Sequence, residues 1–132
     1  MPDSRYEVER QGLRTLTVGA VLAGLGVLLG AFGAHALEDR LASENLLLWE
    51  TGARYHMYHA LAILAVGLLR RRSPAPELKV SATLFGIGIG LFSGSLYFLA
   101  LSDLRMFGLL TPVGGVAFLG GWIALAAGAW RG

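Results

Sequence analysis

The chain has no cysteine and few charged residues, and both features narrow what it can be. Of its 132 residues, 15% are charged, 55% are hydrophobic and four are prolines. Without cysteine, it has no disulfide framework, no thiolate metal site and no cysteine nucleophile. A soluble domain is nearer a quarter charged and cannot hide this much apolar surface at this length. The composition therefore indicates an integral membrane protein with a single domain.

Apolar stretches alternate along the chain with short charged or proline-containing segments. Each stretch is long enough to cross about 30 Å of hydrocarbon at about 1.5 Å per residue. Three consecutive arginines end the second stretch, and Thr111-Pro112 suits the first turn of the helix in the fourth. The sequence predicts an all-α membrane protein, a compact antiparallel bundle of four transmembrane helices in one domain, with spans at about 15–37, 47–69, 80–101 and 112–130.

The end of the first stretch resembles a signal-peptide cleavage site, and the start of the second contains a residue suited to begin a helix. Ala34-His35-Ala36 resembles the cleavage site of a signal peptide. The apolar part before it is longer than the hydrophobic region of a signal peptide, so we expect a retained transmembrane helix. Ser43 is the expected N-cap of the second helix, which would then begin at Glu44.

The distribution of lysine and arginine predicts the orientation, because cytoplasmic loops are enriched in both. One side of the predicted bundle carries Arg5, Arg10, Arg14, Arg70, Arg71, Arg72, Lys79 and Arg131. The other side carries only Arg40, Arg54 and Arg105. We therefore expect both termini in the cytoplasm. The net charge of +2 reflects this topology, and no helical face is left to carry a basic stripe for nucleic acid.

Small residues recur at intervals of four along three of the stretches, which places them on one face of each helix. Lipid supplies no hydrophobic drive between helices, so close backbone approach at small residues does much of the packing. The glycines expected at helix contacts are Gly26, Gly30, Gly86, Gly90, Gly94, Gly120 and Gly128. One glycine face would remain for a second copy of the chain, which favours a homo-oligomer or a larger membrane complex. Trp122 lies deeper than an interface anchor and is expected to pack within the bundle.

Most of the polar side chains within the apolar stretches gather on the outer side of the predicted membrane. Such groups cost free energy unless they are paired, and by default they mark a function. We expect one polar layer, with His56 or His59 pointing inward to contact the first or third helix. The layer comprises His35, Glu50, Arg54, Tyr55, His56, His59, Ser93, Ser95, Tyr97 and Thr111.

This polar layer has several chemical interpretations. The plainest is interhelical hydrogen bonding with a structural role. His56 and His59 are three residues apart on one helical face and, with His35 or Glu50, would suit Zn²⁺ or Cu²⁺. A chain of histidine, carboxylate and tyrosine would instead relay protons. A serine nucleophile at position 93 or 95 lacks the Gly-x-Ser-x-Gly elbow. We predict no metal, no cofactor and no enzymatic activity.

Several motifs resemble those of domain-of-unknown-function family 423, the small YgdD-like inner-membrane proteins of bacteria, which are similar to a small transmembrane protein of mitochondria. The motifs are GAFGAHAL at 30–37, the run from Trp49 to Leu61, LFSGSLY at 91–97, and Thr111-Pro112-x-Gly114-Gly115 followed by Gly121-Trp122. The resemblance extends from about Leu16 to Trp130. It implies four helices in the bacterial inner membrane and assigns no activity.

These observations favour a non-enzymatic integral membrane protein with an accessory or assembly role, whose outer polar layer binds a partner, a lipid or a small ligand. The alternative is a small oligomeric transporter or channel for protons, metal ions or a small solute. Four helices enclose little space, so conduction would require an oligomer.

Overall fold

The computed structural model describes residues 2–131 and is helical almost throughout. Short π-helical turns, η1 and η2, continue the first and third helical columns, and a short 3₁₀ helix, η3, precedes the last helix. In chain order the elements are α1 (Pro2–Phe32), η1 (Gly33–Leu37), α2 (Ser43–Arg70), α3 (Pro76–Gly88), η2 (Ile89–Ser93), α4 (Gly94–Ser102), η3 (Arg105–Leu109) and α5 (Thr111–Arg131).

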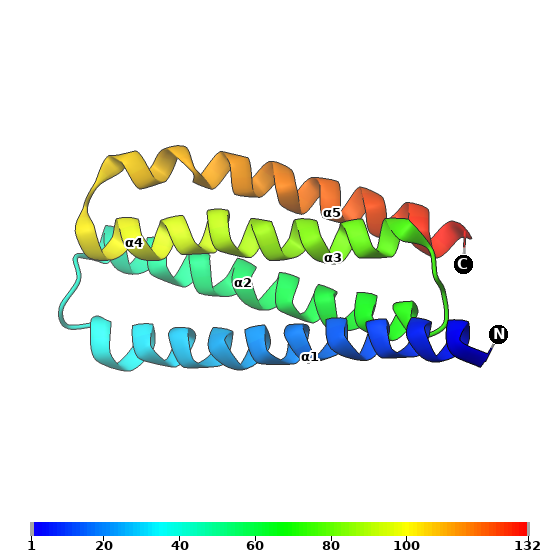
Figure 1. The fold of residues 1–132 in the computed structure, drawn as a ribbon. Helices are drawn as coiled ribbons and strands as arrows, with labels where there is room; N and C mark the ends of the chain where they lie inside the picture. Colours follow the sequence, from blue (N-terminus) through cyan, green and yellow to red (C-terminus); the bar gives the residue numbers. More distant parts are fainter. Residues whose placement is uncertain (1, 132) are drawn as a thin grey trace.

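The helical columns run antiparallel, and both ends of the chain lie at the same end as the turn between α2 and α3 (Figure 1). α1 packs along α2, α2 packs against α3 and α4, and α5 packs against α3 and η2, whereas α2 and α5 scarcely touch. The array is therefore more open than the predicted compact bundle, with α1 and α5 at its two margins (Figure 1).

Three helical segments are long and apolar enough to cross a membrane: Ser4–Leu37, Pro76–Ser102 and Arg105–Arg131. α2 is not among them, although it has 28 residues. Its first half carries charged, imidazole and phenol side chains that lower its mean hydropathy. Three of the four predicted spans are therefore long and apolar enough to cross a membrane, and the span in α2 is the exception.

The buried core joins α2, α3 and α5 at the middle of the molecule. Ile63, Val66, Leu78, Phe85 and Phe118 are each at most 4% exposed. The outward faces of α1 and α5 instead present large exposed apolar side chains, among them Val21, Leu28, Val116 and Ile123. An apolar exterior of this kind is what a lipid-facing surface requires.

Only part of the glycine prediction is correct. Hypothetical Cβ atoms at Gly26, Gly120 and Gly128 would lie 3.3, 3.2 and 2.7 Å from atoms of neighbouring helices. At Gly30, Gly86 and Gly90 they would meet nothing within 4 Å, and at Gly94 only the Ile89 carbonyl oxygen of the same helical column, at 3.9 Å. These four glycines contact no neighbouring helix within the described chain, because a four-residue spacing identifies a helix face without showing which face is covered. A contact of this face with a second copy of the chain stays a prediction.

The closest helix approach uses glycines that the spacing did not reveal. A Cβ at Gly12, Gly19 or Gly67 would lie 2.4–2.7 Å from backbone nitrogen atoms across the α1–α2 contact. At Gly114 it would lie 2.3 Å from the Phe92 backbone nitrogen, between α5 and η2. These positions admit no side chain without a shift of a neighbouring backbone.

The start of α2 differs from the sequence-based expectation, and the residue after α4 has an unusual backbone conformation. α2 begins at Ser43, with Ala42 in the cap position and no side-chain capping hydrogen bond, so the predicted Ser43 cap was wrong. α4 ends at Ser102, and Asp103 follows it in the left-handed region with φ 55°, where an aspartate is tolerated better than most residues. The Asp103 carboxylate accepts a 2.7 Å hydrogen bond from the Asn45 amide, which ties the end of α4 to the start of α2.

Candidate functional site

His56 lies buried between α1 and α4 and uses both of its ring nitrogens. Its Nε2 is 2.8 Å from the Leu22 carbonyl oxygen, and its Nδ1 is 3.1 Å from the Tyr97 hydroxyl. Because a carbonyl only accepts, Nε2 carries the hydrogen and Nδ1 accepts from the tyrosine. The expected inward contact of His56 with the first and third helical columns is confirmed. The imidazole is held as one neutral tautomer.

His59, one turn further along α2, has the opposite tautomer. Its Nδ1 donates to the Tyr55 carbonyl oxygen at 2.7 Å, and its Nε2 accepts from the Trp122 indole Nε1–H at 3.1 Å. An indole N–H only donates, which leaves the imidazole hydrogen on Nδ1. The ring also stacks on Phe118, with centroids 3.5 Å apart and planes 7° apart. His59 therefore connects α2 to α5.

Trp49 makes a similar link between α2 and α1, near the end of α1 that lies away from the chain termini (Figure 1). Its indole Nε1 donates to the Leu29 carbonyl oxygen at 2.8 Å. Its ring lies against Tyr97, with centroids 4.6 Å apart. A Cβ at Gly33 would lie 2.4 Å from the indole, so this glycine in η1 makes room for the ring. The indole, the phenol and the His56 imidazole form one continuous buried contact.

Ser93 and Ser95, both in the third helical column, differ in their hydrogen bonding. Ser95 donates to the Phe92 carbonyl oxygen at 2.9 Å and lies 2.7 Å from the Thr111 hydroxyl at the start of α5. The Ser93 hydroxyl is fully buried in η2 and, among the described residues, has no hydrogen-bond partner. The same is true of the Ser81 hydroxyl in the regular helix α3.

The predicted polar layer is therefore only partly assembled. His56, His59, Ser95, Tyr97 and Thr111 contact groups on neighbouring columns. His35, Glu50 and Arg54 are exposed, as is Tyr55 in part. No ion pair joins Glu50 to Arg54 in the part of the chain that the structure describes. Placing His35 beside the other histidines was wrong, because His35 is exposed and the ring nitrogens of His56 and His59 bind other partners.

The shared-metal interpretation of His56 and His59 does not fit this geometry. The two rings diverge, toward α1 and α5 respectively, and protein partners occupy all four ring nitrogens. Within residues 2–131 no group of three histidine, aspartate or glutamate side chains is arranged to hold a metal ion.

A hollow that we call the outer groove lies between α2 and α5 and has a volume of about 590 Å³. His59 and its partner Trp122 lie on its wall, and aromatic rings form most of the remainder. Sequence reasoning missed Phe92 and Phe118, since nothing in their spacing distinguishes them from ordinary core residues. The lining residues are Tyr55, Tyr58, His59, Leu61, Phe92, Gly115, Phe118, Leu119 and Trp122.

Comparisons with known proteins identify the family. Residues 29–115 match the family model described as protein of unknown function DUF423. A UPF0382 membrane protein of Staphylococcus saprophyticus is 43% identical over 116 residues, covering 88% of this chain and 96% of the relative. YwdK of Bacillus subtilis is 44% identical, covering 86% and 94%. The inner membrane protein YgdD of Escherichia coli is 41% identical, covering 89% and 91%. No solved structure matches significantly. The chain is an inner-membrane protein and belongs to the DUF423 family, as its motifs indicated.

Proposed function

We propose that this protein is a non-enzymatic accessory protein of the inner membrane that binds an amphipathic membrane molecule in the outer groove. The observation that carries this proposal is the groove itself, an aromatic hollow open beside a polar layer whose imidazoles are already satisfied. Its volume of about 590 Å³ lies within the range of about 300–1,000 Å³ that is usual for ligand sites.

The proposal assumes four transmembrane helices with cytoplasmic termini. α1 and the α3–α4 column both start at the end where the chain termini lie (Figure 1). If both cross the bilayer in the same direction, the chain has to return across it between them, and α2 is the connecting segment. The concentration of arginine at the terminal end supports a cytoplasmic location for that end.

The walls of the groove suit a ligand with a long apolar part. Phe92, Phe118, Leu119 and Leu61 offer contact area without unpaired hydrogen-bonding groups. Tyr55 and Tyr58 stand at its edge, with ring centroids 5.8 Å apart, and their exposed hydroxyls can meet a polar group. An amphipathic molecule of the bilayer matches both features, and it reaches the groove directly from the lipid phase.

A transporter of protons or ions is less well supported. Such a role needs imidazole nitrogens that exchange their ligands, whereas His56 and His59 are held by partners on three different helical columns. Both histidines act here as connections between helices. The flux measurement described below tests this directly.

The test fills the groove without disturbing the helices. A Cβ at Gly115 would meet only Phe92 Cδ2, at 3.9 Å, so Gly115→Leu places a side chain in the groove without a backbone clash. Gly24→Leu on α1 is the matched control, because nothing lies within 4 Å of its Cβ position. Each protein is purified in mild detergent, and its retained lipids are identified by mass spectrometry.

We expect a molecule enriched over its share of the bulk membrane to accompany the wild type and Gly24→Leu, and to be lost from Gly115→Leu. Equal retention by all three proteins would count against the groove as a site. Protein-dependent flux in proteoliposomes that His56→Ala abolishes would replace the accessory function with transport.

A further inference from the structure

Three consecutive arginines follow the apolar half of α2, and two of them hold α2 to α1. Arg70 donates to the Thr15 hydroxyl at 2.6 Å and to the Gln11 side-chain oxygen at 3.1 Å. Partial burial lowers the pKa of the Arg70 guanidinium from its usual value, although an arginine stays charged in proteins. Arg71 forms an ion pair with Glu9 at 2.8 Å. These contacts close the end of the α1–α2 pair.

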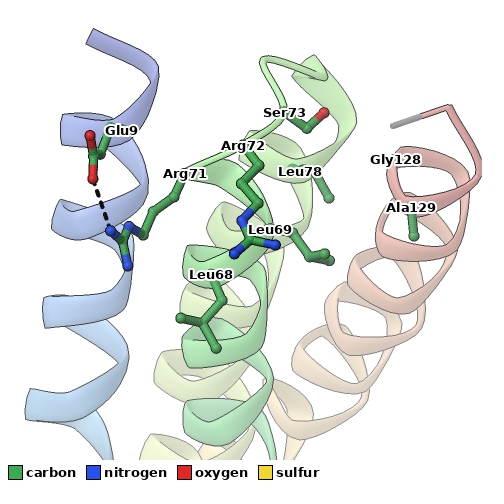
Figure 2. Close-up of a pocket in the computed structure, with 9 residues that line it drawn as sticks. All are labelled: Glu9, Leu68, Leu69, Arg71, Arg72, Ser73, Leu78, Gly128 and Ala129. Carbon is green, nitrogen blue, oxygen red and sulfur yellow. Dashed lines mark hydrogen bonds and ion pairs between the residues drawn. The ribbon is translucent and has the colours of Figure 1, made fainter. Parts of the chain in front are cut away.

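Arg72 has a different environment. Within the described chain its guanidinium forms no hydrogen bond or ion pair. Figure 2 shows it reaching from the end of α2 into the space between α2 and α5, while Arg71 turns away toward Glu9 on α1. The guanidinium is thus free to bind an anion.

The space beside Arg72, which we call the basic hollow, has a volume of about 660 Å³. Its lining combines apolar side chains with charged and polar ones. It is lined by Glu9, Leu68, Leu69, Arg71, Arg72, Ser73, Leu78, Gly128 and Ala129. Since Leu69 ends the predicted second span, the hollow lies where hydrocarbon gives way to lipid headgroups.

Ser73 adds a second donor at the rim. Its Oγ accepts a hydrogen bond from the Ala75 backbone N–H at 3.3 Å. An oxygen that accepts in this way still carries its own hydrogen, which can be donated to a ligand. The nearby Glu9 carboxylate is already paired with Arg71. The one uncompensated charge at the rim is therefore the positive charge of Arg72.

We propose that the basic hollow binds the phosphate of an anionic phospholipid, with Arg72 as the principal ligand and Ser73 as a second donor. A guanidinium binds phosphate oxygens through two parallel N–H donors, which makes it better suited to this task than a simple point charge. Basic pockets between helices on the cytoplasmic side are suited to anionic headgroups. The apolar part of the lining favours a lipid over free phosphate, because the exposed side chains of Leu68 and Leu69 would contact its acyl chains.

The test uses the full-length protein in an uncharged detergent. It is titrated with short-chain phosphatidylglycerol, with phosphatidylcholine of the same chain length, and with inorganic phosphate. Native mass spectrometry measures lipid binding, and the melting temperature is recorded with all three additives. The variants are Arg72→Gln, Arg72→Lys and, as a matched control, Arg10→Gln. Arg10 is an exposed arginine of α1 near the same end of the molecule and does not line the hollow.

We expect the wild type and Arg10→Gln to bind phosphatidylglycerol more tightly than phosphatidylcholine. Arg72→Gln should weaken phosphatidylglycerol binding about tenfold or more, as expected for the loss of a charge-assisted contact. Arg72→Lys should keep part of the preference, since it keeps the charge. Because Arg72 is exposed, the unliganded melting temperature should not change.

Three results would overturn the assignment. One is equal affinity of the wild type for both lipids, and another is an equal loss in Arg72→Gln and Arg10→Gln. The third is stabilisation by inorganic phosphate as large as that by the lipid, which would make the ligand a soluble anion. The outcome is independent of the outer groove, because Gly115→Leu leaves the basic hollow unchanged and Arg72→Gln leaves the groove unchanged.

Discussion

The Trp122 indole donates a 3.1 Å hydrogen bond to the His59 imidazole, and this bond joins two helices whose backbones come close at few positions. α5 packs mainly on α3 and η2, so its contact with α2 depends on a few side chains. The bond also selects the His59 tautomer and orients the ring that stacks on Phe118. One pair of residues thus shapes the wall of the outer groove.

Trp122→Phe should lower the free energy of unfolding by about 1–3 kcal/mol, because it leaves the buried Nε2 of His59 without a donor. The measurement is the melting temperature of the purified protein in detergent. Trp130→Phe is the control, since Trp130 is 93% exposed and should tolerate the change. Equal melting temperatures for the two variants would show that the hydrogen bond does not contribute to stability.

Glycines on covered and uncovered helix faces should differ in their response to substitution. Gly67→Ala places a Cβ 2.5 Å from the Leu16 backbone nitrogen and should cost about 1–3 kcal/mol, the usual penalty of overpacking. Gly90→Ala meets nothing within 4 Å and should leave the monomer's stability unchanged. Thermal unfolding of both variants in detergent checks this. Destabilisation of Gly90→Ala with a smaller particle size would instead place Gly90 at an oligomer contact.

The glycine positions show where sequence reasoning succeeds and where it stops. Apolar length and charge placement predicted the helical stretches, since hydrocarbon thickness and loop charge constrain them directly. The covered face of each helix depends on how the columns are arranged, and this sequence contains no such information at Gly30 or Gly86. The arrangement around α5 is the clearest example, because the spacing did not pair Trp122 with His59.

The candidate site also contains some residues that sequence reasoning placed correctly and others that it did not. The shared helical face and the desolvation cost together predicted that His56 or His59 points inward, since a ring nitrogen facing hydrocarbon would be unsatisfied. The same argument could not place His35, which lies in the π-helical turn η1 and is exposed. Helix propensity and residue spacing predict regular α-helix. They therefore do not predict the π-helical turns η1 and η2.

Tyr97→Phe and His56→Leu should not have additive effects. The two residues share one hydrogen bond of 3.1 Å, so each single substitution removes it. A double-mutant cycle on unfolding free energies should give a coupling of about 0.5–1.5 kcal/mol. His35→Leu is the comparison, because His35 is exposed and makes no contact with Tyr97 that would couple them. A coupling near zero for His56 and Tyr97 would contradict the assigned contact.

The membrane topology depends on α2, whose first half carries Glu50 and Arg54 on an exposed face. Charged groups on a lipid-facing surface are costly unless they reach the headgroups, and long side chains near a helix end can do so. Arg54 is 16 positions from Arg70, which is about 24 Å at 1.5 Å per residue, so it lies close to the outer boundary of the hydrocarbon. We therefore expect α2 to cross fully. Reporter fusions should place Ser73 in the cytoplasm and a site near Ala42 outside it. If both report the same side, α2 does not span the bilayer, and the outer groove then lies outside the depth at which a lipid-phase ligand can enter it.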